Sequence, residues 1–532
     1  MKLGIDFGTT RVVVAHADRG NYPLVSFEAS DATTRDWFPP LVAVGNGQRL
    51  YGWEAWAAQE EPGWTVVRSI KRLLANSGPQ TQIEIAEQSF LLTDLLSEMA
   101  TKLRESLTGQ SSLDIRPKEQ LEVVLGVPAN ANSNQRFLTV EAFRAAGFEV
   151  LGLLNEPSAA AIEFGHGQRV RTQKKERARL VVYDLGGGTF DASLVEAIDG
   201  EYAVIASAGN AACGGDDFDE RLATLALDEA GVCEDEREAM DQAEVFQLHE
   251  ECQRRKESLH PNTRQIVIDL GLVRAGWPQV SVPAAKFYEA CQPMVAETIR
   301  ITEEVVATST SGEQDVVMPE ALYVTGGASE LPLIVRMLRT TFGRRVRRSA
   351  YTRSATAIGL AIHADAQSGY RLREQFVRYF GVWREGEDGQ TVVFDPLFAK
   401  GLTLPNPDEP PLSISRRYLP AHNLGHYRYL ECSRLSGCGW PDGDITVWDE
   451  IRFPFDPSLR GEANLFHVPV KRVGNGTASE VEERTSCDSN GMLAVTLTMV
   501  SDDFRREYKL GRWSAAEASV SPARLGRRRT KR

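Results

Sequence analysis

The stretches LGIDFGTT at residues 3–10 and VVYDLGGGT at residues 181–189 share one order: an apolar run, an aspartate, then glycine and threonine. Each continues into a second apolar run, VVVA at 12–15 and ASLV at 192–195. A short Gly-Thr turn between two apolar runs is typical of a β-hairpin. Two such units so far apart in the chain predict a duplicated fold whose hairpins face one cleft.

Alternating helices and strands are predicted around these hairpins. The apolar run at 121–127 predicts a strand, and Ser133 is expected to cap the helix that follows it. Pro157 suits the first turn of another helix. Residues 215–260 are mostly helical in pattern, and an Ala- and Ile-rich helix is expected at 354–365. The first part of the chain is therefore α/β in class.

The character of the chain changes after about Ser368, where Pro, Gly and aromatic residues increase and helical periodicity is lost. Strands are predicted at 428–432, 445–448 and 492–500, and Asn490-Gly491 is a hairpin turn signal. The predicted organisation is therefore a first domain at 1–368, a linker at 369–379, an all-β sandwich domain at 380–515 and a basic tail at 516–532.

The bulk composition excludes several classes of protein. A net charge of -13 over 532 residues argues against general nucleic-acid binding. No apolar run approaches the length of a membrane helix, and Asp6 comes too early for a signal peptide, so a cytoplasmic protein without a membrane partner is expected. The seven cysteines form no CxxC pair, which favours neither a zinc site nor disulfides.

The hairpins and their surroundings carry the groups that a magnesium-bound triphosphate needs. Glycine turns and hydroxyls can surround phosphates, carboxylates can hold the waters of Mg²⁺, and a cation or base can act near the attacking water. The candidates for phosphate contacts are Gly8, Thr9, Thr10, Gly186, Gly187, Gly188 and Thr189. The candidate carboxylates are Asp6, Asp184 and Glu156. Lys71 is the candidate cation, with Asp191 or Glu156 as proton acceptors.

An ordered set of motifs resembles the DnaK-type (seventy-kilodalton heat-shock) chaperones. The motifs are LGIDFGTT (3–10), VPA (127–129), NEPSAAA (155–161), DLGGGTFD (184–191), GGDDFD (214–219) and VTGGAS (324–329). The resemblance implies a duplicated actin-like (RNase H-like) ATPase domain that binds ATP or ADP with Mg²⁺ between two lobes.

The resemblance also implies roles for individual residues. Asp6 and Asp184 would lie by the magnesium ion, through water, and Glu156 and Asp191 would position the attacking water. Lys71 matches the family's catalytic lysine. The threonines Thr9, Thr10 and Thr189 would contact phosphates, and Gly214, Gly215, Gly326 and Gly327 would approach the nucleotide.

The positions that hold adenosine in the family depart from its pattern. The aligned residues are Gln253, Lys256 and His260 on one helix, then Glu330 and Arg353. Phosphate chemistry is therefore expected to be retained, whereas base and ribose recognition is expected to be rewritten. Glu330 and Arg353 are expected to have exchanged charge sign as a pair.

The β domain resembles the family's peptide-binding sandwich at residues 395–405 and 487–495. The apolar, acid-containing linker of the family is not visible at 369–379, and no helical lid is expected. The leading hypothesis is an ATP-dependent chaperone-like protein with slow hydrolysis coupled to the binding of unfolded or extended polypeptide, with a co-chaperone or a dedicated protein as further partner.

Three alternatives remain open. A nucleotide-binding scaffold without turnover could serve one dedicated protein partner. A sugar or acid kinase could use the same fold, although no sugar pocket is evident. The β domain could also have a different binding role or a purely structural one.

Overall fold

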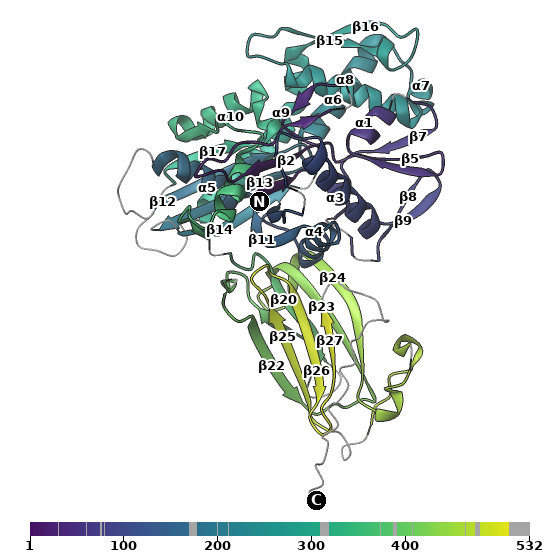
Figure 1. The fold of residues 1–532 in the computed structure, drawn as a ribbon, viewed down its shortest axis with the longest axis vertical. Coiled ribbons are helices and arrows are strands. Elements are labelled where there is room, and N and C mark those ends of the chain that lie inside the picture. Colours follow the sequence, from purple (N-terminus) through teal and green to yellow (C-terminus); the bar gives the residue numbers. More distant parts are fainter. Residues whose placement is uncertain are drawn as a thin grey trace, which may run out of the picture. The chain divides into compact units, whose positions relative to one another are not determined.

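The protein is described by a computed structural model, drawn in Figure 1. The described residues are 1–29, 31–59, 61–74, 77–78, 80–116, 118–169, 178–198, 201–210, 212–308, 319–372, 374–386, 391–406, 408–462, 464–473 and 479–509. The chain divides into two compact units, the first from Met1 to Val377 and the second from Arg378 onward. The predicted basic tail and the end of the chain, where a lid was not expected, lie outside the described residues.

A four-stranded sheet with the order β11-β10-β1-β2 forms one half of the first unit. β1 pairs antiparallel with β2 and parallel with β10, which pairs parallel with β11. The bounds are β1 Lys2–Phe7, β2 Val12–His16, β10 Glu122–Val127 and β11 Glu149–Asn155. The first Gly-Thr turn therefore joins β1 to β2, as predicted.

A second sheet repeats this arrangement with the order β18-β17-β12-β13-β14-β19. β12 pairs antiparallel with β13 and parallel with β17, which pairs parallel with β18. The bounds are β12 Ala178–Leu185, β13 Phe190–Ile198, β14 Glu201–Asn210, β17 Ala321–Thr325, β18 Val346–Arg348 and β19 Arg371–Leu372. The duplication read from the two hairpin sequences is thus present as two sheets with matching pairing.

Helices connect and cover these sheets (Figure 1). Their bounds are α1 Trp53–Ala58, α2 Ile70–Leu73, α3 Leu92–Gly109, α4 Ser133–Ala145, α5 Glu156–Arg169, α6 Gly215–Ala230, α7 Glu234–Glu238, α8 Gln242–Glu257, α9 Ala284–Thr308, α10 Pro332–Phe342 and α11 Ala355–Ala364. The cap of α4 was predicted one residue too late. Asn132, not Ser133, accepts from the backbone N–H of Gln135, whose side chain accepts in return from the N–H of Asn132.

Smaller strands complete the first unit. A three-stranded sheet has the order β6-β5-β7, with β5 Val42–Gly45, β6 Gln48–Tyr51 and β7 Trp64–Val67. The two-stranded pairs are β3 Phe27–Glu28 with β4 Thr34–Arg35, β8 Gln82–Ile85 with β9 Gln88–Leu91, and β15 Gln265–Asp269 with β16 Gln279–Pro283.

Two helices without bulky side chains at their contact link the halves of the first unit. α11 packs on α5 and on β1, and its residues between Ala355 and Ala364 are almost all buried. A Cβ added at Gly359 would collide with the carbonyl oxygen of Ala159, and one at Gly4 would collide with the backbone of Ala361. Backbone therefore lies directly against backbone, which only glycine permits here.

The second unit consists of two antiparallel four-stranded sheets, β21-β20-β23-β24 and β22-β25-β26-β27. The bounds are β20 Tyr379–Glu385, β21 Val392–Phe398, β22 Leu412–Tyr418, β23 Leu424–Leu435, β24 Pro441–Pro454, β25 Val481–Cys487, β26 Leu493–Met499 and β27 Phe504–Lys509. Arg384 in β20 and Tyr429 in β23 both bond to Glu483 in β25, and Phe453 in β24 contacts Phe504 in β27. The sheets therefore face each other as a sandwich.

The segment predicted as a linker, 369–379, contributes mainly to the first unit. β19 pairs parallel with β14 at Glu201 and Tyr202. Glu374 is buried and accepts from the backbone N–H of Asn155 at 3.0 Å. The composition of the chain changes near residue 368, but the contacts of the first unit continue to Val377.

Candidate functional site

The two Gly-Thr hairpins lie opposite each other. A Cβ built on Gly187 would lie 2.5 Å from the hydroxyl oxygen of Thr10, and one built on Gly188 would lie 2.6 Å from the methyl carbon of Thr9. The cleft between them is lined by both turns, including Gly8, Thr9, Thr10, Gly186, Gly187 and Thr189. The turns thus form a narrow cradle of backbone groups and hydroxyls, and turns of this kind bind anions.

The first turn of α6 lies against the second hairpin. The backbone N–H of Gly215 donates to Gly186 at 3.0 Å, and that of Asp216 donates to Gly187 at 2.7 Å. A Cβ on Gly214 would lie 2.5 Å from the carbonyl oxygen of Gly187, so the close approach requires glycine. Gly326, which follows β17, has a φ of 82°, and a Cβ built on it would lie 2.5 Å from Oδ1 of Asp184.

Four carboxyl groups and one ammonium group occupy the base of the cleft. The Nζ atom of Lys71 donates to Oε1 of Glu156 at 2.6 Å, and both side chains are only 12% exposed. Asp6, Asp184 and Asp191 line the same cleft. Asp6 ends β1, Asp184 lies near the end of β12 and Glu156 begins α5, so the strand ends and a helix start converge here.

Burial and crowding raise the pKa values of the three aspartates. Burial first, and then the charge of Glu156, raises the pKa of Asp6 to about 8 and that of Asp184 to about 7, although Lys71 opposes both shifts. Burial first, and then the charges of Glu156 and Asp184, raise the pKa of Asp191, and Lys71 again opposes the shift. Burial lowers the pKa of Lys71, but the attraction of Glu156 and Asp6 is larger in sum and holds it above its usual value.

This set of groups fits a divalent cation brought in with phosphates. One ammonium group does not balance four carboxyl groups, so a cation would relieve the repulsion that raises the pKa of Asp6 and Asp184. Among the described residues, no group of three or more His, Cys, Asp or Glu has the arrangement of an all-protein metal site. Mg²⁺ is commonly held by one or two carboxylates together with water and phosphate oxygens, which matches these residues.

The predicted nucleoside residues on α8 are only partly in the cleft. Lys256 and Gln253 line it, and Nζ of Lys256 donates to the carbonyl of Gly215 at 2.6 Å and to Asp219 at 2.7 Å. His260 lies just beyond α8, is exposed, and is absent from the described residues that line the cleft. Lys256 thus holds α6 in place.

Ion pairs that the sequence only partly predicted occupy the outer part of the cleft. Arg353 bonds to Glu330 at 2.7 Å, which confirms that these two residues form a pair of opposite charges. Arg353 also donates to the carboxylate of Glu257 at 2.8 Å. Arg11 donates two further hydrogen bonds to the same carboxylate, at 2.7 and 2.8 Å. Burial would raise the pKa of Glu257, but Arg11 and Arg353 lower it to about 2.

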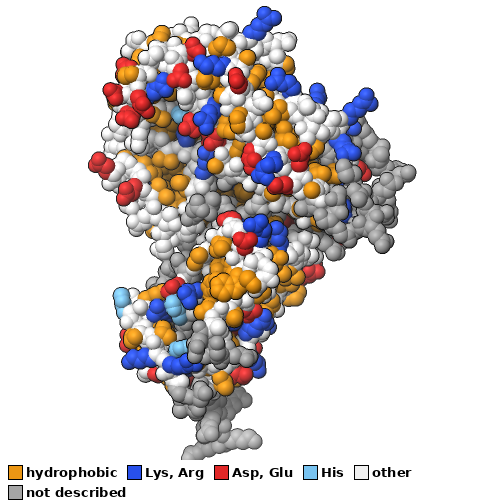
Figure 2. All heavy atoms as spheres, turned by 180° about the vertical axis from the view of Figure 1, so that it is seen from behind, with side chains coloured by type: hydrophobic (Ala, Val, Ile, Leu, Met, Phe, Trp, Pro, Cys, Tyr) orange, Lys and Arg blue, Asp and Glu red, His pale blue; other side chains and the backbone are white. Residues whose placement is uncertain are grey.

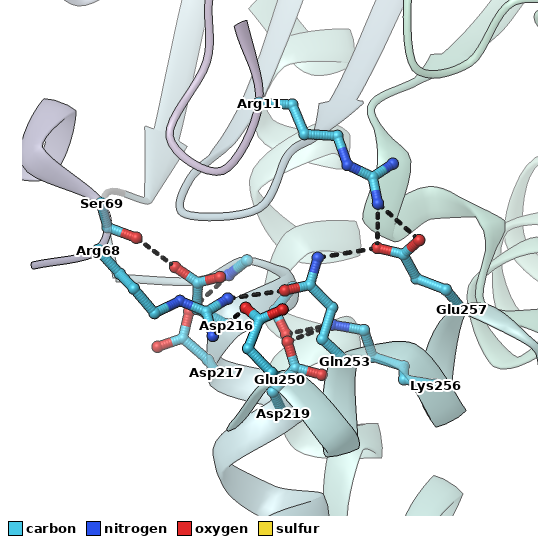
Figure 3. Close-up of polar contacts among 12 residues, drawn as sticks. Arg11, Arg68, Ser69, Asp216, Asp217, Asp219, Glu250, Gln253, Lys256 and Glu257 are labelled. Carbon is cyan, nitrogen blue, oxygen red and sulfur yellow. Dashed lines mark hydrogen bonds and ion pairs between the residues drawn. The ribbon is translucent and has the colours of Figure 1, made fainter. Parts of the chain in front are cut away.

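The same network joins the two halves of the unit. Figure 3 shows Arg11 directed at Glu257 from the first hairpin, Gln253 directed at the same carboxylate, and Arg68 directed at Gln253 and Glu250. Three further contacts cross near α2: Ser69 to Asp216 at 2.8 Å, and Arg72 to Asp217 at 2.9 Å and to the carbonyl of Gly188 at 2.7 Å. Arg11 directly follows Thr10, and Arg72 directly follows Lys71. These positions next to predicted site residues are the feature of the sequence that could have indicated both arginines.

A model of the Hsp70 protein family matches residues 2–378, which include both hairpins, Lys71 and Glu156. The chain belongs to the Hsp70 family. Hsp70 proteins combine an actin-like ATPase fold with a β sandwich, and the sheets of this Hsp70 member are consistent with that architecture. They bind ATP or ADP with Mg²⁺, substrate polypeptides and co-chaperones.

The family match ends at the boundary between the two units and does not extend over the second. Within the described part of this Hsp70 chain, no helix has the length and apolar character that a membrane crossing requires. The match supports a chaperone or ATPase type of function for the first unit.

Proposed function

We propose that this Hsp70 member hydrolyses Mg-ATP slowly in the cleft of its first unit and couples turnover to the binding of extended polypeptide by its β unit. The observation that carries the proposal is the buried contact between Lys71 and Glu156 at 2.6 Å, beside Asp6, Asp184 and Asp191 and between two facing Gly-Thr hairpins. The match to the Hsp70 family over residues 2–378 favours this function over that of a sugar or acid kinase.

Different residues of the cleft bind the phosphates, hold the cation and position the attacking water. Thr9, Thr10, Thr189 and the glycines of both turns bind the phosphates. Asp6 and Asp184 would hold the waters of a divalent cation, which would supply positive charge beside the phosphates. The ammonium group of Lys71 stabilises the transferred phosphoryl group. Glu156 and Asp191 orient the attacking water and accept its proton.

Support for polypeptide binding comes from the surface of the second unit. Figure 2 shows apolar side chains gathered on one face of this unit. Its exposed apolar residues include Val392, Val393, Trp440, Ile445 and Val447, which lie on or beside β21 and β24, the edge strands of one sheet. An extended peptide can add to such an edge through backbone hydrogen bonds while apolar side chains meet its alternate residues.

Support for coupling comes from the segment that leads into the second unit. Glu374 accepts from the backbone and the side chain of Asn155, the residue next to Glu156, and Arg136 donates to Asn155 at 2.7 Å. A movement of this segment would therefore act directly on the first turn of α5, which carries Glu156.

The direct test is steady-state ATP hydrolysis by the full chain with and without an unfolded polypeptide. Lys71→Ala is expected to lower turnover about 100-fold or more, because a positioned cation of this kind contributes that much to transition-state stabilisation. Mg-ATP binding, measured by calorimetry, is expected to change little, since both hairpins remain. Lys102→Ala is the matched control, because Lys102 pairs with Glu54 and Glu105 on the outside of the unit. Unchanged turnover in Lys71→Ala would contradict the assignment.

The runner-up function is a nucleotide-binding scaffold without turnover that serves a dedicated protein partner. It is favoured by the small volume of the phosphate cleft, about 120 Å³, and by the ion pairs of Glu257 and Arg353 beside it. The same measurements separate the two functions, because a scaffold would bind Mg-ATP but show no turnover in the unmodified protein.

A further inference from the structure

One segment of the first unit carries positive charge without any acidic residue. Residues 331–364 contain seven arginines and no lysine, aspartate or glutamate, although the chain as a whole has a net charge of -13. Six of these arginines are exposed, and they lie on α10, on the turn Gly343–Arg345 or on β18. They are Arg336, Arg339, Arg344, Arg345, Arg347 and Arg348. This part of the surface is therefore basic on an acidic protein.

Five of the six exposed arginines pair with no carboxylate of the described residues. We call these five the arginine patch: Arg336, Arg339, Arg344, Arg345 and Arg347. The sixth, Arg348, contacts Glu330 at 3.3 Å. Arg336 lies 5.9 Å from the centre of the ring of Tyr288, which is a contact with a neutral group. The positive charge of the patch thus has no direct counter-charge in the described part of the chain.

Exposed arginines elsewhere in the first unit are found beside an acid. Examples are Arg19 with Asp18 at 2.9 Å, Arg144 with Glu141 at 3.3 Å and Arg300 with Glu297 at 2.6 Å. An acidic neighbour relieves the repulsion between like charges, which works against a compact fold. The arginine patch lacks this relief, so an anion bound there would remove a repulsion that the fold itself leaves in place.

A structural role explains only one member of the patch. β18 is the edge strand of the second sheet, and charged side chains on an edge strand hinder its pairing with other chains. That role applies to Arg347, which lies on β18. Arg336 and Arg339 lie one turn apart on α10, and Arg344 and Arg345 lie in the turn between helix and strand. The patch therefore extends beyond what protection of the edge requires.

The chemistry of the patch suits carboxylates held by a protein. A guanidinium group is planar and can donate two parallel hydrogen bonds to one carboxylate, which the ammonium group of lysine cannot do. The segment has arginine at every basic position. Clusters of arginine are a recurring means of binding acidic peptide motifs. A run of Asp or Glu residues would thus supply both the charge and the geometry that the patch lacks.

Two other anionic partners fit less well. Single-stranded nucleic acid binds through stacking of its bases on aromatic side chains, and the segment exposes only the ring of Tyr351. A membrane surface binds through apolar side chains as well as charge. The apolar side chains of α10, Leu333, Ile334 and Leu338, are buried in the core of the unit and are not free to enter a bilayer.

We propose that the arginine patch is the docking site for a partner protein, and that it binds an acidic segment of that protein through pairs between arginine and carboxylate. The partner is recognised by a run of Asp or Glu residues. The site is separate from the nucleotide cleft and does not depend on hydrolysis. Because the pairs form at the surface, salt weakens the binding.

The test is titration of the full chain into a fluorescently labelled hexaglutamate peptide at low salt, followed by fluorescence polarisation. The patch variant carries Arg344→Gln, Arg345→Gln and Arg347→Gln together. It is expected to weaken binding about tenfold or more, since each exposed ion pair contributes about two- to fivefold. The matched control carries Arg19→Gln, Arg144→Gln and Arg300→Gln. It has the same net charge as the patch variant but keeps the patch, so its affinity is expected to stay within about twofold of the unmodified protein.

Four outcomes would overturn the proposal. The unmodified protein could fail to bind the peptide, the patch variant could bind as tightly as the unmodified protein, or both triple variants could lose the same affinity. The fourth is tighter binding of a single-stranded oligonucleotide or of phosphatidylserine vesicles, lost in the patch variant, because the partner would then not be a protein. If the patch variant unfolds at a lower temperature than the unmodified protein, Arg336→Gln with Arg339→Gln on α10 decides by the same comparison.

Discussion

His363 is a titratable side chain placed where its charged form is disfavoured. It lies in α11, partly buried, and its Nδ1 atom has no hydrogen-bond partner among the described residues. Burial lowers its pKa to about 4. The unfolded chain has no such constraint and returns the imidazole to its usual pKa near 6.5. The stability of the first unit should therefore depend on pH in a predictable direction.

Between about pH 6.5 and pH 4, His363 is protonated in the unfolded chain but neutral in the folded chain. The folded state therefore loses stability as the pH falls. From pH 7 to pH 5 this single site should contribute a loss on the order of 2 kcal/mol in the free energy of unfolding. His363→Gln is expected to remove that part of the loss, measured by urea denaturation at both values. His260→Gln, at an exposed position beyond α8, should keep the full loss of stability between pH 7 and pH 5. If both variants lost the same stability over this range, the prediction would be contradicted.

Individual residues could be predicted where they belong to motifs in a fixed order. Asp6, Lys71, Glu156 and Asp184 were all found from sequence, and the structure brings them to one cleft. The contacts of Glu257 could not be found in this way. Its partners, Arg11 and Arg353, are 246 and 96 positions away, and nothing local in the sequence marks three such positions as neighbours.

The contact of α11 with α5 and β1 depends on glycine at Gly359 and Gly4. Gly359→Ala is expected to destabilise the first unit on the order of 2 kcal/mol, because the added methyl group meets the carbonyl oxygen of Ala159 in a closely packed contact. Gly109→Ala, at the end of α3, is the control, because a Cβ there meets nothing within 4 Å. It should leave stability unchanged or raise it slightly, since alanine favours helix.

Thermal unfolding of both variants measures the difference. If Gly359→Ala lowered the unfolding temperature less than Gly109→Ala, the helices would be able to separate here without cost. That result would contradict the direct backbone contact.

Elements were predicted well when their pattern was local and less well when their ends depended on capping. The two hairpins and the strand β10 follow from apolar runs interrupted by Gly or Pro. The α4 cap was assigned to Ser133, although Asn132 and Gln135 form the reciprocal pair, because Ser and Asn are equally good caps by type. In the second unit the predicted strands at 428–432 and 445–448 are the central parts of β23 and β24, which the structure extends to Leu424–Leu435 and Pro441–Pro454.

For the chain as a whole, Glu374 is the residue through which polypeptide binding is expected to influence hydrolysis. Glu374→Gln keeps the size of the side chain but removes the charge that faces Asn155 and Arg136. In this variant, the rate of ATP turnover with unfolded polypeptide is expected to equal the basal rate without it. Glu303→Gln, on the exposed face of α9, is the control. Full stimulation in Glu374→Gln would show that coupling does not pass through this contact.

This contact could not be predicted from the sequence, because nothing in the composition of 369–379 marks its single glutamate as buried. Glu374 is recognisable as a structural residue only once Asn155 is known to lie beside it.

The burial of Glu374 also fixes where this chain can be divided. A fragment that stopped at residue 368, where the composition changes, would lose β19 from the edge of the second sheet and would leave the N–H of Asn155 without its acceptor. It would also leave the guanidinium group of Arg136 buried without the carboxylate that balances it. The smallest fragment that folds on its own therefore includes Glu374. Residues that have the composition of a linker are thus part of the first folded unit.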